Sequence, residues 1–121
     1  MKLEKELMKS IHQRLSIYEI TGEVIWFGRL NSLKVKTITG KWVQGLPKGT
    51  PDWLALIRNR QDVVSALFIE CKSDSGRLRK EQSLFHDKYN KKKGVFVIEI
   101  RDPKEFDNWI DKNAKDFVAC I

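Results

Sequence analysis

Apolar residues recur along the chain with two different periods, which distinguish helices from strands. Residues 3–16 carry apolar side chains three and four positions apart, so they predict an amphipathic helix, and Gly22 closes that segment. Residues 23–30 are rich in β-branched and aromatic side chains and predict a strand. Residues 34–43 form two short alternating arms around Thr39-Gly40, which indicates a β-hairpin or a basic flap.

The second half of the chain predicts further strands and helices. Residues 45–51 contain two prolines and two glycines, so they form a loop that leads into a strand over residues 52–57. A strand over residues 63–72 follows a polar turn, and two strands this close in sequence pair most simply as an antiparallel hairpin. The remaining predicted elements are a helix over 78–93 stopped by Gly94, a strand over 95–100 that is apolar on both faces, and a helix beginning at Asp102-Pro103.

This order of elements predicts one compact domain of the α/β (α+β) class, with helices against the faces of a mixed β-sheet. A length of 121 residues suits one domain, which would span residues 1–121. No stretch reaches the roughly 18 to 20 apolar residues that a bilayer-spanning helix requires. The N-terminus also lacks the apolar run of a secretory signal, so we expect a soluble protein of the cytoplasm that does not bind membranes.

Charge adds a first indication of the partner. The net charge is +7, and residues 72–93 contain eight Lys and Arg against three Asp and Glu. Basic surfaces attract polyanions and release their counterions, so this region suits a nucleic acid, although many basic proteins simply have a solvated charged face. The two cysteines, Cys71 and Cys120, form no C-x-x-C pair and indicate neither a disulfide framework nor a zinc site.

Two charged residues interrupt the apolar strand over residues 63–72. Strand alternation sends Glu70 and Lys72 to the same face as Phe68, so a carboxylate and an ammonium lie side by side on a largely buried strand. A structural salt bridge is one interpretation. Burying such a pair contributes little stability, however, because desolvation can exceed the Coulomb attraction.

Asp52 provides a second interpretation. It opens the preceding strand, and the antiparallel hairpin would bring it near Glu70. Two carboxylates suit a hard cation such as Mg²⁺ or Mn²⁺, and the backbone carbonyl of Cys71 could supply a further ligand. Lys72 could then orient or deprotonate an attacking water, or stabilise charge that develops on a phosphate.

Two polar residues occupy apolar stripes on the predicted helices. Glu4 lies among the apolar positions of the first helix, whereas Glu6 points away, so helix phase favours Glu4 as the acid that faces the carboxylates. Gln82 lies between Leu78 and Phe85 on the later helix. Either Glu4 or Gln82 could instead reach solvent at a helix end.

The motifs resemble a known family when they are taken in order. They are Gly49-Thr-Pro-Asp52, Phe68-Ile-Glu-Cys-Lys-Ser73, Gly76-Arg-Leu-Arg-Lys-Glu-Gln82 and Gly94-Val-Phe-Val97. This set resembles the PD-(D/E)-x-K nuclease superfamily, and within it the virus-type replication-repair nuclease (VRR-NUC) domain. The resemblance covers about residues 45–100 and implies a restriction-endonuclease-like fold.

The resemblance also implies an activity. Asp52 and Glu70 would hold Mg²⁺ or Mn²⁺, Lys72 would be the catalytic lysine, and Gln82 and Glu4 would complete the site, with Gln82 positioning the lysine or the water. The expected enzyme is a DNA endonuclease that acts on branched DNA such as four-way junctions, as a homodimer in a bacterial or phage-infected cell. Seven basic residues are candidates for holding DNA phosphates, and these are Lys48, Arg77, Arg79, Lys80, Lys91, Lys92 and Lys93.

Two other functions compete with this hypothesis. The chain could be a nuclease-like module that binds DNA without cutting it, although intact Asp52, Glu70 and Lys72 argue against this. It could also be a nonenzymatic interaction protein that uses its four tryptophans as a partner surface. We expect those tryptophans to lie in the core or a dimer interface instead.

Overall fold

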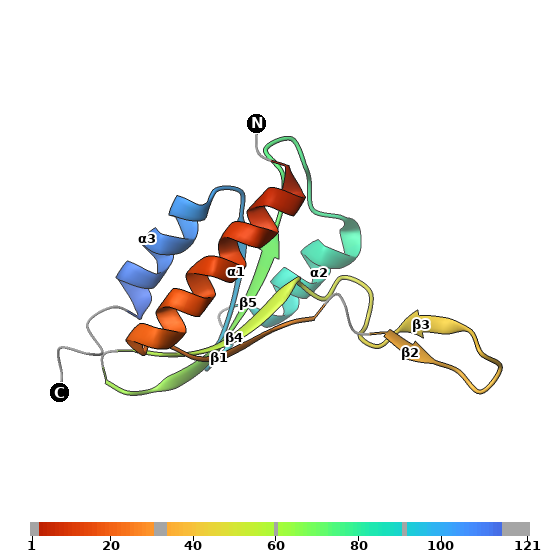
Figure 1. The fold of residues 1–121 in the computed structure, drawn as a ribbon, viewed down its shortest axis with the longest axis horizontal. Coiled ribbons are helices and arrows are strands. Elements are labelled where there is room, and N and C mark those ends of the chain that lie inside the picture. The colour runs from red at the N-terminus through yellow and green to blue at the C-terminus, as the bar shows by residue number, and fades with distance from the viewer. Residues whose placement is uncertain (1–2, 31–33, 60, 91, 115–121) are drawn as a thin grey trace.

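A computed structural model describes residues 3–30, 34–59, 61–90 and 92–114 (Figure 1). These segments contain three helices and six strands. In chain order they are α1 (Glu4–Thr21), β1 (Val24–Arg29), β2 (Lys34–Lys36), β3 (Trp42–Gln44), β4 (Trp53–Arg58), β5 (Val64–Cys71), α2 (Lys80–Tyr89), β6 (Val95–Ile100) and α3 (Pro103–Asn113).

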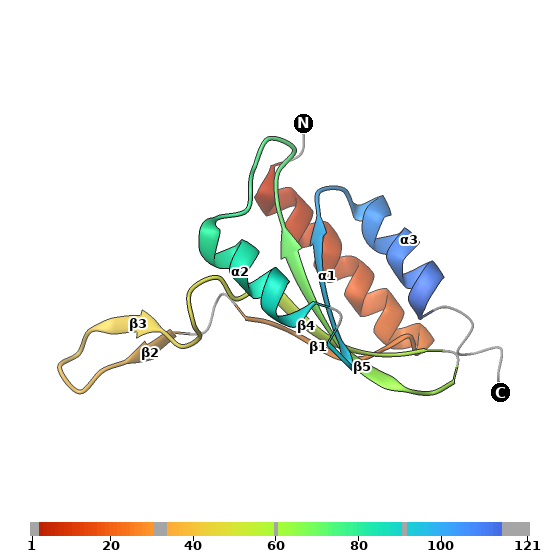
Figure 2. The ribbon, with the colours of Figure 1, turned by 180° about the vertical axis from the view of Figure 1, so that it is seen from behind.

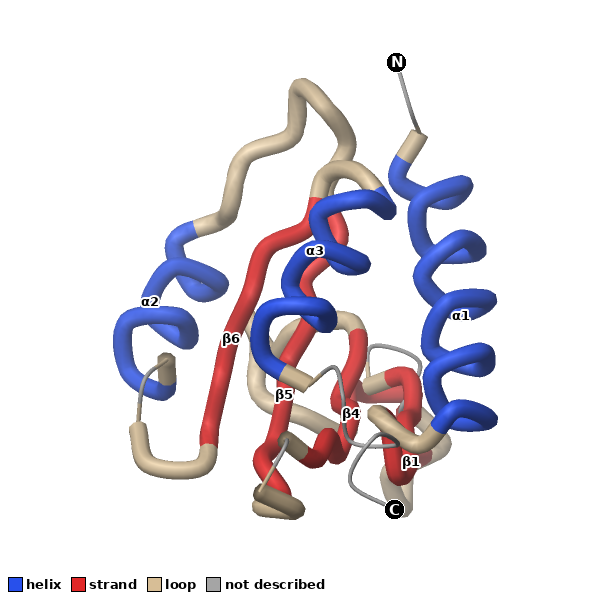
Figure 3. Tube along the Cα trace, turned by 90° about the vertical axis from the view of Figure 1, so that its left-hand side faces the viewer, coloured by secondary structure: helices blue, strands red, loops and turns tan. Residues whose placement is uncertain are grey.

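The central sheet has four strands in the order β1-β4-β5-β6. β4 pairs antiparallel with both β1 and β5, and β5 pairs parallel with β6. α1 and α3 cover one face of this sheet and α2 lies on the other (Figure 3). The mixed sheet with helices on both faces is therefore confirmed. β2 and β3 form a separate hairpin that projects from the body of the molecule, as Figure 2 shows from behind.

The core lies between the sheet and the pair α1 and α3. Leu7, Ile11 and Leu15 are fully buried along α1, at the helical spacing that the sequence predicts. Burial of each such side chain stabilises the fold by about 1.5–3 kcal/mol. The two helices are also joined by Asp107 of α3, which accepts hydrogen bonds from Arg14 Nε at 3.0 Å and from Tyr18 Oη at 2.7 Å.

Several predicted elements are confirmed. α1 extends beyond the predicted residue 16 to Thr21, and Gly22 caps it as expected. α3 begins at Pro103, where the Asp102 side chain accepts a hydrogen bond from the Lys104 backbone N–H. None of the helices in the described part of the chain is long and apolar enough to cross a membrane.

The predicted extent of the helix over residues 78–93 was wrong at both ends. α2 begins at Lys80, so Leu78 lies in the preceding loop rather than on the helix. It ends at Tyr89 because Asn90 has an extended backbone, and the Asn90 side-chain oxygen accepts a hydrogen bond from Val97 N–H at 3.0 Å. Gly94 does not stop the helix, since it lies in the turn just before β6.

The four tryptophans differ in burial. Trp53 is 4% exposed in the core, and Trp109 packs its ring edge-to-face against Phe96 with a centroid separation of 5.3 Å. Trp26 on β1 and Trp42 on the projecting hairpin are 48% and 63% exposed. The core expectation therefore holds for Trp53.

The loop before β4 is held close to α2 by Gly49. Gly49 has a positive φ of 92°, and a Cβ atom added there would lie 2.5 Å from the carbonyl carbon of Glu81 in α2. Thr50 Oγ1 donates a hydrogen bond to the Pro47 carbonyl at 2.7 Å within the same loop. A side chain at position 49 would push the loop and α2 apart.

Gly49→Ala should therefore destabilise the protein more than Gly94→Ala. Gly94 also has a positive φ, of 81°, but a Cβ atom there would meet nothing within 4 Å. Both variants incur the left-handed backbone cost of about 1–2 kcal/mol, and only Gly49→Ala adds a backbone clash. Chemical unfolding of the two variants measures the difference, and equal losses of unfolding free energy would contradict the close packing of this loop.

Candidate functional site

The end of β5 positions Glu70 and Lys72. Leu67, Ile69 and Cys71 point into the core under α1, whereas the alternate residues face α2. Phe68 contacts the Phe85 ring of α2 at a centroid distance of 5.1 Å, and Glu70 and Lys72 continue the same row. Glu70 is 2% exposed and Lys72 is 9% exposed. The alternation thus buries a charged pair beside α2, as the sequence predicts.

The pairing of β4 with β5 places Asp52 beside this pair. Trp53 lies opposite Ile69 in the antiparallel register, so Asp52 reaches the end of β5. Its Oδ2 accepts a hydrogen bond from the Cys71 backbone N–H at 2.8 Å. Its backbone carbonyl accepts another from Leu30 N–H at 2.7 Å. The two carboxylates that the sequence singled out therefore converge where the central strands β4 and β5 meet, at the start of β4 and the end of β5.

Glu70 is only partly satisfied by its neighbours. Its Oε1 accepts a hydrogen bond from Gln82 Nε2 at 2.6 Å and lies 3.8 Å from Lys72 Nζ. Its Oε2 is buried and has no hydrogen-bond partner among the described residues. Gln82 is itself oriented by its Oε1, which accepts from the Arg79 N–H at 2.7 Å. Gln82 thus contacts Glu70, whereas the resemblance suggests that it positions Lys72 or a water.

The two carboxyl groups interact unfavourably in their charged forms. Burial raises the pKa of Glu70 to about 8, and the charge of Asp52 adds to this rise while Lys72 opposes it. Burial also raises the pKa of Asp52, and the Cys71 N–H partly counteracts that increase. The negative charge of Glu4 raises both pKa values further. The site therefore holds more negative charge than Lys72 alone neutralises.

A groove of about 560 Å³ opens above these groups. Glu4 of α1 lines it, so the structure places Glu4 rather than Glu6 beside the carboxylates. Glu4 is exposed at the rim and not inside the apolar stripe, whose buried part begins at Leu7. The lining residues are Glu4, Pro47, Lys48, Gly49, Thr50, Asp52, Glu70, Lys72, Arg79, Glu81 and Gln82.

The oxygen atoms in this groove suit a hard divalent cation as ligands. Buried Glu70 Oε2 lacks a partner among the described residues, and carboxylate oxygens are the ligands that Mg²⁺ and Mn²⁺ prefer. Among the residues that the structure describes, no group of three or more His, Cys, Asp or Glu side chains is arranged to hold a metal ion. The candidate ligands are the Asp52 and Glu70 carboxylates with the Cys71 carbonyl, and one or two carboxylates are usual for Mg²⁺.

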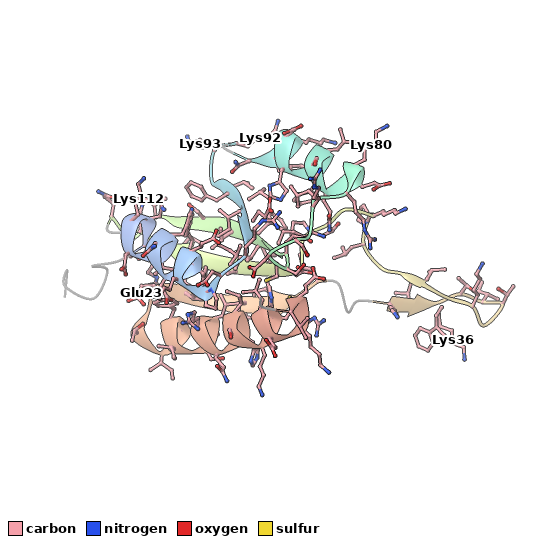
Figure 4. All side chains as sticks on the ribbon, turned by 90° about the horizontal axis from the view of Figure 1, so that it is seen from above. Glu23, Lys36, Lys80, Lys92, Lys93 and Lys112 are labelled. Carbon is pink, nitrogen blue, oxygen red and sulfur yellow. The ribbon has the colours of Figure 1, made fainter. Side chains whose placement is uncertain are left out.

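The predicted phosphate-binding residues divide into two groups. Lys48 and Arg79 line the groove. Lys80 is exposed at the start of α2, and Arg77 is exposed in the loop before it. Lys92 and Lys93 lie beyond the opposite end of α2 (Figure 4). The ten residues of α2 separate the groups by about 15 Å. Lys91 lies outside the described residues.

Three charged residues that the sequence did not single out act on the site. Glu99 lies opposite Glu70 in the parallel β5–β6 register and raises its pKa. Arg29 of β1 lowers the pKa of Asp52. Arg101 donates to the Ser73 carbonyl at 2.8 Å and to the Gly76 carbonyl, so it holds the loop between β5 and α2. All three positions depend on strand order and register, which no local motif encodes.

Comparison of the chain with models of known protein families, with curated proteins and with solved structures found no match to any of them.

Proposed function

We propose that this protein is a divalent-metal-dependent endonuclease that hydrolyses phosphodiester bonds in DNA. The main support is the environment of the Glu70 carboxylate, which is 2% exposed and lies beside a second carboxylate. One of its oxygens is buried without a hydrogen-bond partner among the described residues. A structural ion pair with Lys72 would not require Asp52, and the 3.8 Å separation of Lys72 from Glu70 is long for such a pair. Perturbed carboxyl groups that converge in a groove are typical of a functional site.

The side chains divide the chemistry between them. Asp52 and Glu70 would hold the cation, which would lower the pKa of a water molecule and neutralise charge on the scissile phosphate. The Cys71 N–H fixes Asp52, and Gln82 fixes Glu70 through its 2.6 Å hydrogen bond. The Lys72 ammonium would orient the attacking water and stabilise the charge that develops on phosphate oxygens.

Basic residues around the groove support a polyanionic substrate. Lys48, whose Nζ lies 3.6 Å from Glu81 Oε1, and Arg79 line the groove beside the carboxylates, and the chain has a net charge of +7. Side chains of this kind hold phosphates without reading base sequence, which suits an enzyme that selects DNA by its structure.

The choice of DNA structure and the oligomeric state are further parts of the proposal. The resemblance to virus-type replication-repair nucleases supports cleavage of branched DNA, including four-way junctions, by a homodimer. Two sites related by a two-fold axis would suit paired incisions. A particle mass in solution equal to the 14.2 kDa of one chain would rule out the dimer.

Cleavage should require Mg²⁺ or Mn²⁺ and the three central residues. Lys72→Ala should reduce cleavage at least about 100-fold, since it removes the charge beside the reacting phosphate. Glu70→Ala should abolish cleavage while DNA binding is retained. Above about pH 8, where the Glu70 carboxyl group is ionised, binding should be strengthened because a carboxylate that faces phosphate repels it. The assay uses labelled four-way junction, duplex and single-stranded DNA, with either metal or with EDTA.

Lys104→Ala is the matched control, because Lys104 is an exposed lysine on α3, on the other side of the sheet from α2. It should cut like the wild type. Cleavage by Lys72→Ala at the wild-type rate, or no cleavage of any substrate with metal present, would overturn the enzyme proposal. Binding without cleavage would favour the nuclease-like binding module.

Metal affinity should increase with pH up to about 8 and then level off. Below the Glu70 pKa of about 8, a cation must displace a proton from that carboxyl group, which weakens binding by up to about tenfold per pH unit. Asp52→Asn should weaken binding at every pH. Titration calorimetry with MgCl₂ and MnCl₂ measures both effects, and an affinity that is constant from about pH 6 to about pH 8 would contradict the role of Glu70 as a ligand.

A further inference from the structure

A second and larger groove adjoins the candidate active site. Its volume is about 990 Å³, and it runs between α1 and the strands β1 and β4. Glu4 and Asp52 line both this groove and the one that contains Glu70. The two grooves therefore meet at the carboxylates, one on each side of Asp52.

Basic side chains surround this second groove. Lys5 and Lys9 are exposed and lie four residues apart on α1, so they project from one face of the helix. Arg29 lines the groove from β1, where it lies opposite Trp53 in the strand register. Apart from the shared Glu4 and Asp52, the charged residues that line this groove are all basic.

Three aromatic rings also line the same groove. The His12 ring lies 5.6 Å from Phe27 and 5.8 Å from Trp53, and those two rings lie 6.1 Å apart. Trp53 is buried, whereas His12 is exposed at the groove surface. Basic side chains beside accessible aromatic rings hold single-stranded nucleic acid, because the cations follow the phosphates while bases stack on the rings. The exposed His12 ring and the half-buried Phe27 ring are the stacking surfaces in this groove, and the buried Trp53 ring supports them.

We infer that the groove between α1 and β1 binds an unpaired DNA strand that continues past the phosphate to be cut. The inference rests on the proposed nuclease function, and it assigns the strand on one side of the cut to Lys5, Lys9, Arg29 and His12. The strand on the other side passes Lys48 and Arg79. A DNA backbone that crosses the carboxylates must leave the site in both directions. The two grooves that meet at Asp52 provide one path in each direction.

The test is fluorescence anisotropy with a labelled oligonucleotide in EDTA, where no cleavage interferes. The double variant Lys5→Ala/Lys9→Ala should bind single-stranded DNA at least about tenfold more weakly than the wild type. The slope of log affinity against log salt should decrease by about 1.4, because each phosphate of a single strand that is no longer neutralised reduces it by about 0.7. His12→Ala should weaken binding about fivefold or more by removing a stacking surface, with the salt slope unchanged.

The matched control is Lys104→Ala/Lys112→Ala, which removes the same charge from exposed lysines of α3. Equal binding and equal salt slopes for the two double variants would overturn the inference. If Lys5→Ala/Lys9→Ala weakens binding of fully paired duplex DNA as much as binding of single-stranded DNA, the restriction to unpaired strands is wrong. Melting curves of the double variant and of the single variant Lys9→Ala show whether the altered lysines leave the fold intact.

Failure of this inference and failure of the proposed function give different results. Wild-type cleavage combined with unchanged binding by Lys5→Ala/Lys9→Ala would reject only the role of this groove. Weakened binding by that variant, with no cleavage by the wild type, would reject the nuclease and leave the groove as a single-strand binding site.

Discussion

Antiparallel pairing of β4 with β5 brings Asp52 to Glu70 and Lys72 at the end of β5. The register that sets Trp53 opposite Ile69 buries both side chains in the core and brings Asp52 to the Cys71 N–H. A shift of one residue would send the apolar side chains of β5 to the α2 face and Glu70 into the core under α1. The same backbone hydrogen bonds thus specify both the core and the position of the Asp52 and Glu70 carboxylates.

The charged groups at the end of β5 are costly to the fold. Glu70 is buried with one cation at 3.8 Å and one amide at 2.6 Å, and its pKa of about 8 reflects the resulting preference for the neutral form. An apolar side chain at position 70 would extend the row that Phe68 begins. Proteins commonly accept such local instability where a function requires it. The apolar core under α1 provides the compensating stability.

Local sequence signals predicted the parts of the site that one hairpin brings together. Alternation placed Glu70 and Lys72 on one face, and the short turn brought Asp52 to them. The end of α2 could not be predicted in this way, because it depends on the hydrogen bond between Asn90, just after the helix, and Val97 of β6. The influence of Arg29 on Asp52 likewise depends on the pairing of β1 with β4, which are far apart in sequence. Helix phase distinguished Glu4 from Glu6 but could not show that Glu4 lies beyond the buried part of α1.

We propose that Glu70 holds a cation and does not stabilise the fold, and thermal unfolding of Glu70→Gln separates these two roles. The amide introduced by this substitution would keep an oxygen to accept from Gln82, and Lys72 would keep its favourable interaction with the Asp52 charge. Without metal at about pH 7, Glu70→Gln should melt above the wild type, and MnCl₂ should raise the melting temperature of the wild type only. A variant that melts below the wild type, with both proteins indifferent to MnCl₂, would instead identify Glu70 and Lys72 as a structural ion pair.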